Sequence, residues 1–354
     1  MIDTARQSWP SPKRPKPIVF LGAGGIVRAA HLPAYREKGF EIAGVFDIAT
    51  KTAQRLAFDE QIPRVFESLE EACSLEAVVY DLAVPADQIL SVLRKLPNGA
   101  TVLIQKPMGR DLREASRILA LCRKKRLVAA VNFQLRFAPN MLVLQHQLAR
   151  KKLGAIVDVE IRTRTHTPWS TWKFLRGIPR MEILYHSIHY IDLLRACFGE
   201  PVRVWSSADA DPLFEGYADT RMMARLEFAG GVRASLVTAH SHEFGPLAKS
   251  SHVLVEGTRA AMLATMGVNL EYPRGEPDSL KICLRHGDWK LLLLEGSWFP
   301  KAFAGTMSNL QRFAAREDPI LHTSVADARK TMAVVEACYR SSQRGKTRKS
   351  KPKQ

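Results

Sequence analysis

The segment 183–194, ILYHSIHYIDLL, places three polar rings within five residues, in a chain with only ten histidines. Tyr185, His186 and His189 could bind a metal, transfer a proton, or pack against a neighbouring element. In a helix, Tyr185 and His189 share one face because residues four apart lie on the same side. Tyr185 could then orient the imidazole of His189. Asp192 could also orient it, or pair with a nearby cation.

Proton transfer is the chemistry that best suits such an imidazole. Oxidation of a secondary alcohol removes a hydroxyl proton while a hydride leaves the same carbon, and the unperturbed pKa of histidine lies near neutrality. A cation beside the hydroxyl would favour the developing alkoxide. Lys106 follows a predicted strand, TVLIQKP, and could supply that cation.

A metal site is the second interpretation of the histidines. His186 and His189, three residues apart, could both ligate zinc, but no third ligand is evident nearby in the sequence. The five cysteines are dispersed and form no C-x-x-C pair, which argues against a cysteine-based zinc site and a disulfide framework. We therefore expect no metal, and the remaining alternative for His186 is a packed helical histidine.

A glycine cluster, GAGGIV, follows the apolar run Ile18–Leu21 and precedes a helical pattern. Gly22 would allow a tight turn, and Gly24 would let backbone N–H groups approach a pyrophosphate at the start of the helix. Gly25 adds local freedom, and Val27 stands where the third glycine of G-x-G-x-x-G would be. The strand–glycine–helix context indicates a dinucleotide-binding loop.

The second predicted strand, FEIAGVFD, ends on Asp47, 25 residues after Gly22. A carboxylate at this place can accept both ribose hydroxyls of NAD and would repel the 2′-phosphate of NADP. We predict NAD as the cofactor, although Lys51 is close enough to keep NADP possible.

Composition limits the class of protein. A chain of 354 residues favours two domains, and 46% hydrophobic with 25% charged residues is typical of a globular protein. No run reaches the roughly 20 apolar residues of a membrane span, and the N-terminus lacks the apolar core of a signal peptide. We expect a cytoplasmic protein without a membrane partner.

The net charge of +17 is concentrated at the ends of the chain. Residues 1–17 carry +3 and residues 344–354 carry +6. Such tails would attract polyanions weakly and in a salt-sensitive way, so we expect no specific nucleic-acid partner.

Two patterns of secondary structure divide the chain. Strand-like runs alternate with helical patterns from 18 to 137, which predicts a doubly wound parallel sheet of the Rossmann type. From 138 to 343 strand-like runs follow one another between turns, which predicts an α/β domain with an open-faced, mostly antiparallel sheet. We expect flexible tails at 1–17 and 344–354, and a closing helix that could pack back on the first domain.

Several ordered signatures resemble the Gfo/Idh/MocA family of NAD(P)-dependent oxidoreductases over 17–344. They are GAGGIVRAAHLPAYRE, DLAVPADQI, QKP, VNFQLRFAPN, GTMSNLQRF and TSVADARKTMAVVEACYRSS. The resemblance implies a Rossmann domain and a second α/β domain, with the active site in the cleft between them. It also implies assembly through the free face of the second sheet, and sugars, cyclitols or their derivatives as substrates.

The resemblance assigns chemical roles to particular residues. Lys106 matches the lysine of the family's E-K-P, and His189 matches the histidine of its D-x-x-x-H. This chain departs from the family at Tyr185, where the aspartate is expected, and at Gln105, which replaces the glutamate. Gln88 stands near where many relatives carry a histidine.

The expected site residues fall into two binding groups besides the catalytic group of Lys106, His189, Tyr185 and His186. The predicted cofactor-binding residues are Gly22, Gly24, Gly25, Ile26, Asp47, Ala83, Val84, Pro85, Gln105 and Lys106. The predicted substrate-binding residues are Arg136, Trp169 and Trp172, with ordinary loop packing as the alternative for the two tryptophans.

The sequence thus predicts an NAD(P)-dependent dehydrogenase or reductase acting on CH–OH groups of a sugar or polyol, in a homodimer or homotetramer. His189 would be the acid/base, and Lys106 would polarise the substrate oxygen. Three alternatives stay open: a glycosidase of the same fold that uses NAD transiently, a catalytically inactive nucleotide- or sugar-binding protein, and a nucleic-acid binder through the basic tails.

Overall fold

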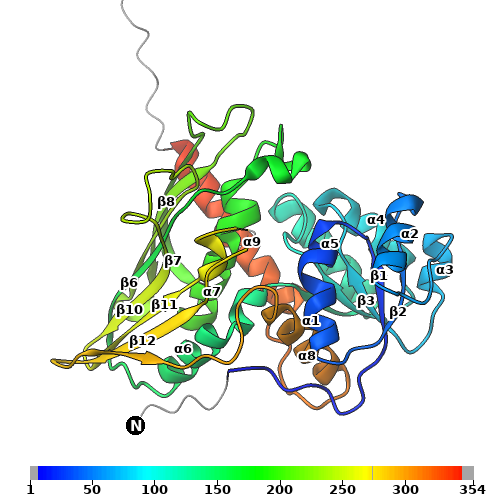
Figure 1. The fold of residues 1–354 in the computed structure, drawn as a ribbon, viewed down its shortest axis with the longest axis horizontal. Helices are drawn as coiled ribbons and strands as arrows, with labels where there is room; N and C mark the ends of the chain where they lie inside the picture. The colour runs from blue at the N-terminus through cyan, green and yellow to red at the C-terminus, as the bar shows by residue number, and fades with distance from the viewer. Residues whose placement is uncertain (1–6, 273, 345–354) are drawn as a thin grey trace, which may run out of the picture. The chain divides into compact units, whose positions relative to one another are not determined.

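The computed structural model describes residues 7–272 and 274–344, which form two units. Of the described residues, the first unit contains 7–150 and 293–332, and the second contains 151–272, 274–292 and 333–344. Figure 1 shows the elements of both. Among the described residues, no helix is both long and apolar enough to cross a membrane.

The first unit is built on a five-stranded sheet with the order β2-β1-β3-β4-β5, in which every pair of neighbours is parallel. Its strands are β1 (Ile18–Leu21), β2 (Ile42–Phe46), β3 (Val79–Leu82), β4 (Thr101–Ile104) and β5 (Val128–Val131). All residues of β1, β3 and β4 are buried, as expected for a parallel sheet covered by helices on both faces. The predicted Rossmann-type sheet is confirmed.

Helical segments connect these strands, and two further segments follow β5. They are η1 (Val27–His31), α1 (Leu32–Glu37), α2 (Thr50–Asp59), α3 (Leu69–Cys73), η2 (Ala86–Gln88), α4 (Ile89–Lys95), α5 (Leu112–Lys124), η3 (Gln134–Phe137) and α6 (Pro139–Ala149). Side-chain caps begin two of the helices: Ser68 accepts from the N–H of Glu71 at 3.1 Å, and Asp111 from that of Glu114 at 2.7 Å.

Helix α8 (Ala302–Ala314) returns to the first unit from late in the chain. Phe303, Met307 and Leu310 of α8 join the apolar core around β1 and the helices that follow it. The expected boundaries, 18–137 and 138–343, stay a prediction, and so does the expectation that a closing helix packs back on the first domain. The compact units of the structure divide the chain after residues 150, 292 and 332, because α8 buries its apolar face in the core of the first unit.

The N-terminal segment is held to the first unit from Gln7 onwards, where the Gln7 side-chain amide donates to the Leu293 carbonyl at 3.0 Å. The Trp9 ring meets Phe137 edge-on with 5.3 Å between centroids, and its indole N–H donates to Asp318 at 2.7 Å. The backbone N–H of Lys16 donates to Gln311 at 2.8 Å. The part of the expected N-terminal tail that the structure describes is thus anchored. Residues 1–6 of that tail, and all of the expected basic tail except Arg344, lie outside the described residues.

Replacing Asp318 with Asn should lower the free energy of unfolding by about 1.5–3 kcal/mol at neutral pH, because hydrogen bonds to a charged group are lost. Burial opposes ionisation of the Asp318 carboxyl, but hydrogen bonds from Trp9, Asn309 and Arg312 hold its pKa below the usual 3.8. A lowered folded-state pKa gives stability that is present above pH 3.8 and is lost as the pH falls through the folded value. Urea unfolding of both proteins should show the difference shrink in acid. An undiminished difference below pH 3 would contradict the assignment.

The second unit is built on an eight-stranded sheet with the order β13-β12-β11-β10-β6-β9-β8-β7. Its strands are β6 (Ile156–Arg164), β7 (Pro201–Asp209), β8 (Arg221–Phe228), β9 (Arg233–Ala239), β10 (Ser250–Gly257), β11 (Ala260–Thr265), β12 (Ser279–Leu284) and β13 (Trp289–Leu292). Among these described strands, β6 and β9 form the one parallel pair. Burial alternates along β8, β10 and β11, so one face of the sheet is covered. The predicted open-faced, mostly antiparallel sheet is confirmed.

The second unit also contains helix α7 (Ile188–Phe198), which Figure 1 shows beside the sheet. The shorter segments are η4 (Trp169–Thr171), η5 (Lys173–Leu175), η6 (Glu182–Ser187), η7 (Ala229–Gly231) and η8 (Gly267–Asn269). Helix α9 (Val325–Arg344) begins in the first unit and ends in the second, where Ser341 and Ser342 accept from backbone N–H groups of β7 at 2.9 Å.

Candidate functional site

The glycine loop after β1 has a backbone that only glycine suits. Gly22 has φ +112°, and a Cβ placed on it would lie 2.3 Å from the carbonyl oxygen of Ala83. The Gly22 N–H donates to the carbonyl of Phe46 at 2.7 Å, which ties the loop to the end of β2. Gly24 and Gly25 are exposed, and nothing lies within 4 Å of where their Cβ atoms would be. Ile26 occupies the N-cap position of η1 and is half-buried. The loop therefore leaves open space beside its backbone, as a phosphate cradle requires.

Asp47 lies directly after β2 and braces this loop. One carboxylate oxygen accepts from the N–H of Ala23 at 2.7 Å, and the other from the N–H of Ala49 at 2.8 Å. A carboxylate offers about four acceptor positions, so capacity remains for ribose hydroxyls. The half-buried Asp47 thus fits the predicted contact with NAD, while Lys51 is exposed on α2.

The other predicted cofactor residues follow the neighbouring strands β3 and β4. Ala83, Val84 and Pro85 come directly after β3, and Gln105 and Lys106 directly after β4. Because β1, β3 and β4 are adjacent and parallel, their carboxyl ends meet at the edge of the sheet that carries the glycine loop. None of these five residues is fully buried. The first unit therefore gathers all ten predicted cofactor residues on one edge of the sheet, and the residues present fit a dinucleotide.

The histidine segment 183–194 is not one regular helix. Glu182–Ser187 forms a π-helix, η6, and α7 begins at Ile188. A π-helix pairs residues five apart in its backbone, so a side chain can meet neighbours at both i+4 and i+5. Glu182 does so: one carboxylate oxygen lies 3.1 Å from Nδ1 of His186 and accepts from the hydroxyl of Ser187 at 2.7 Å.

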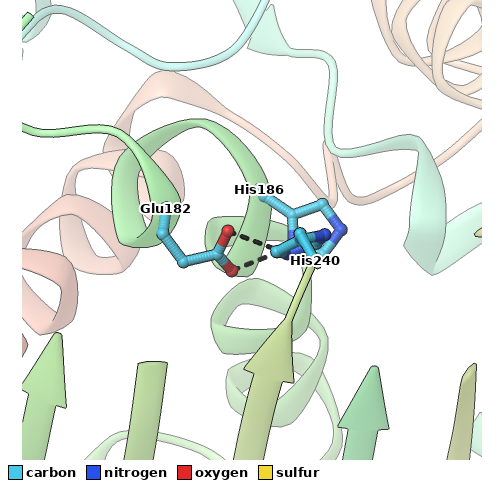
Figure 2. Close-up of side chains that lie close together, drawn as sticks. All are labelled: Glu182, His186 and His240. Carbon is cyan, nitrogen blue, oxygen red and sulfur yellow. Dashed lines mark hydrogen bonds and ion pairs between the residues drawn. The ribbon is translucent and has the colours of Figure 1, made fainter. Parts of the chain in front are cut away.

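A third side chain, His240, completes this cluster from the end of β9. Its Nε2 lies 2.9 Å from the other oxygen of Glu182 (Figure 2). The hydroxyl of Thr167 lies 2.7 Å from Nδ1 of His240, and Thr238 donates to Glu182 at 2.7 Å. The sequence thus brings three polar groups together from a π-helix and from a distant strand end.

The cluster keeps a carboxylate ionised inside the protein. The side chains of Glu182 and His240 are 0% exposed, and that of His186 is 16% exposed. Burial alone would raise the pKa of Glu182, but the adjacent His240 and His186 imidazoles hold that pKa well below its usual range. A buried charge is tolerated only with such partners.

Tyr185 and His186 are adjacent in sequence but have different neighbours. Tyr185 packs on a small apolar cluster of Trp169, Leu175 and Met181, and its ring lies 5.7 Å from that of Phe174. His186 faces Glu182 and His240 instead. The predicted assistance from both residues in catalysis stays a prediction.

His189 and Asp192 lie on the first two turns of α7, where both are buried. Asp192 lies 4.0 Å from a guanidinium nitrogen of Arg195, so the expected alternative of a nearby cation partner is present. The acid/base role of His189 stays a prediction.

The three predicted substrate residues lie in different surroundings. Arg136 is buried in the first unit, where its guanidinium pairs with Asp327 at 2.7 Å and donates to the His322 carbonyl at 3.0 Å. Trp169 is buried in the second unit, with its ring edge-on to His240 at 4.8 Å and tilted against Trp172 at 5.9 Å. These contacts match the packing alternative for the tryptophans, and the substrate role of all three stays a prediction.

The expectation of no metal stays a prediction, but the structure brings together a different set of possible ligands. The sequence paired His186 with His189, whereas ligand atoms of Glu182, His186 and His240 all lie within 4.8 Å of one another. Glu182 stands four residues before His186, so its spacing was a usable signal. His240 lies 54 positions after His186 and could not be placed from local pattern.

Models of known protein families match residues in both units. A family model described as an oxidoreductase family with an NAD-binding Rossmann fold, Gfo/Idh/MocA, matches residues 16–133, and the model of the Gfo/Idh/MocA C-terminal domain matches 141–263. The resemblance seen in the sequence is thereby confirmed.

Two relatives and one solved structure illustrate the likeness. The uncharacterized oxidoreductase YhhX of Escherichia coli is 26% identical over 239 residues, 62% of this chain and 64% of the relative. Glucose-6-phosphate 3-dehydrogenase of Bacillus subtilis is 25% identical over 160 residues, 45% of each chain. The chain therefore spans less than two thirds of the length of either relative.

The solved structure of UDP-N-acetylglucosamine 3-dehydrogenase from Acidithiobacillus ferrooxidans shares the fold. Its TM-score is 0.73 at 19% identity, over 93% of this chain and 98% of that one. Together with the two family models, these likenesses show that the chain belongs to the Gfo/Idh/MocA oxidoreductase family, with an NAD-binding Rossmann domain as its first unit.

Proposed function

We propose that this protein is an NAD-dependent oxidoreductase that transfers a hydride between nicotinamide and a carbon of a sugar, cyclitol or related polyol. The observation that carries the proposal is the open glycine loop at Gly22 braced by Asp47. Two of the similar proteins are named as dehydrogenases of sugar derivatives, which supports the substrate class.

The chain's own residues would handle the proton and the charge. In the oxidative direction, His189 takes the hydroxyl proton as the C–H bond breaks, and the alcohol carbon becomes a carbonyl. Lys106 stabilises the negative charge that develops on the reacting oxygen. Tyr185 and His186 assist His189. A bound nicotinamide would supply the hydride acceptor in this direction and the hydride donor in the other.

Replacing Asp47 with Ala should weaken NADH binding by about 10- to 100-fold, because hydrogen bonds between the ribose and a charged acceptor are lost. Fluorescence titrations with NADH and, in parallel, NADPH measure this. Asp47→Asn is the matched control, because it keeps the shape and one oxygen acceptor for the backbone of the loop. If the wild type bound NADPH more tightly than NADH, Lys51 and not Asp47 would set the cofactor preference. If neither nucleotide bound, the proposal would be refuted.

A turnover screen of polyols and sugar acids separates the remaining alternatives. NADH formed in proportion to product supports the dehydrogenase. Release of sugar without net NADH would favour the glycosidase that uses NAD transiently. Saturable NADH binding without turnover of any candidate would favour an inactive binding protein, which the Tyr185 and Gln105 departures kept open.

We further propose that the chain self-associates through the uncovered face of its eight-stranded sheet. Trp205 of β7 and Met223 of β8 are 45% and 64% exposed although both are large and apolar. Replacing both with Glu should shift the protein to monomers in size-exclusion chromatography with light scattering. Phe58→Glu, at an exposed position of α2 in the other unit, is the control. A monomeric wild type would contradict this assignment.

A further inference from the structure

We propose that Glu182, His186 and His240 form a binding site for one divalent transition-metal ion of the zinc class. The site lies wholly within the second unit. The proposal is independent of the nucleotide site, so its test does not need turnover.

The donor atoms already have nearly the spacing that one ion requires. Ring nitrogens of His186 and His240 lie 3.1 and 2.9 Å from the two carboxylate oxygens of Glu182. Around a tetrahedral zinc ion with bonds of about 2.0–2.1 Å, adjacent ligand atoms are about 3.3 Å apart. All three candidate ligand atoms lie within 4.8 Å of one another. Small side-chain rotations would therefore suffice to admit an ion.

Two buried atoms of the cluster lack a hydrogen bond of normal geometry among the described residues. They are Oε2 of Glu182 and Nε2 of His240, which face each other only as an ion pair. A buried polar atom without a hydrogen bond costs stability. A cation that takes a lone pair from each atom would satisfy both.

Neighbouring hydroxyl groups hold these ligands in place. Thr167 lies 2.7 Å from Nδ1 of His240, which leaves Nε2 aimed at Glu182. Ser187 and Thr238 each donate to Oε1 of Glu182 at 2.7 Å. Hydrogen bonds of this kind orient the ligands of metal sites and tune their affinity.

The donor set indicates the class of metal and an open coordination position. Two imidazoles with one carboxylate suit zinc and its neighbours in the first transition row better than magnesium or calcium, which prefer oxygen ligands alone. Three protein ligands leave a fourth position for water or an oxygen of a small molecule. His186 is the partly exposed member of the cluster, so this position would open on its side.

The test is a titration of the chelator-treated full chain with Zn²⁺ by isothermal calorimetry, with Co²⁺ as a spectroscopic probe. Wild type should bind one equivalent. His186→Phe, which keeps an aromatic ring against Tyr190, should bind at least roughly 100-fold more weakly, since even loss of an outer partner costs 10- to 100-fold. Glu182→Gln should do the same. His252→Gln is the matched control, because His252 pairs with Glu160 at 3.0 Å on the eight-stranded sheet but, within the part of the chain that the structure describes, belongs to no such cluster of three.

Folding is checked by circular dichroism and thermal melting. Zn²⁺ should raise the melting temperature of wild type and of His252→Gln, and leave that of His186→Phe unchanged. If wild type bound no stoichiometric Zn²⁺ in the titration, the proposal would be overturned, and the cluster would be one glutamate with two histidines that binds no ion. Equal affinity in wild type and in a folded His186→Phe would overturn it as well.

Discussion

Replacing His189 with Ala is expected to lower kcat by about 10²- to 10⁴-fold, the usual contribution of a general acid or base. Binding of NADH should be unchanged, because the predicted nucleotide residues all lie in the first unit and His189 lies in the second. The physical reason is that an alkoxide cannot form readily without a nearby group to take the hydroxyl proton. The measurement is steady-state turnover of the best polyol substrate, together with an NADH titration.

Two comparisons make this result specific to His189. His252→Gln removes a different histidine of the same unit, one that is only partly buried, and should leave kcat near the wild-type value. His186→Phe and Tyr185→Phe should each cost less than His189→Ala if these residues only assist. Intact turnover in His189→Ala would refute the acid/base role, and a larger loss in His186→Phe would transfer that role to His186.

Replacing Glu182 with Ala is expected to lower the free energy of unfolding by about 3–5 kcal/mol, the cost of breaking a buried charge pair by removing one partner. The change leaves His186 and His240 packed together, with ring centroids 4.4 Å apart, and removes the acceptor of two buried hydroxyl groups. Urea unfolding followed by circular dichroism measures the loss.

A more exposed glutamate–histidine pair on the eight-stranded sheet of the same unit provides the control for Glu182. Glu160 contacts His252 at 3.0 Å, but its side chain is 35% exposed, so Glu160→Ala should cost no more than about 1 kcal/mol. For Glu182→Gln, the decrease in the free energy of unfolding should lie between those of the two alanine variants, because glutamine keeps the side-chain volume and one acceptor oxygen. Equal decreases in the free energy of unfolding for Glu182→Ala and Glu160→Ala would show that burial does not make the Glu182 cluster more stabilising than the exposed pair.

The nucleotide half of the protein could be predicted from sequence because its signals are local. Gly22, Gly24 and Asp47 follow strands whose apolar runs are continuous, and the order of the strands in a doubly wound sheet brings the strand ends together. The class of the second sheet was also predictable, because alternating burial in β8 and β10 appears as alternating polarity in the sequence.

Unit boundaries were less predictable than fold class. Phe303 and Met307 of α8 fill the core of the first unit, more than 250 residues after β1, and Trp9 is held by Asp318. A helical pattern reveals that a segment has an apolar face, but not which of two sheets that face covers. The expected boundaries of the two domains therefore stay a prediction.

By itself, the sequence determined the type of fold, the glycine loop with the aspartate that braces it, and the histidine segment as a candidate place for chemistry. Only the tertiary structure decided which groups surround that segment. The π-helix turns Glu182 onto both His186 and Ser187, a register that differs from the regular helix assumed from spacing. The pairing of β8 with β9 and of β9 with β6 then fixes where β9 ends and so delivers His240 to Glu182. Because such long-range contacts depend on strand order and register, no local pattern around His186 could have revealed them.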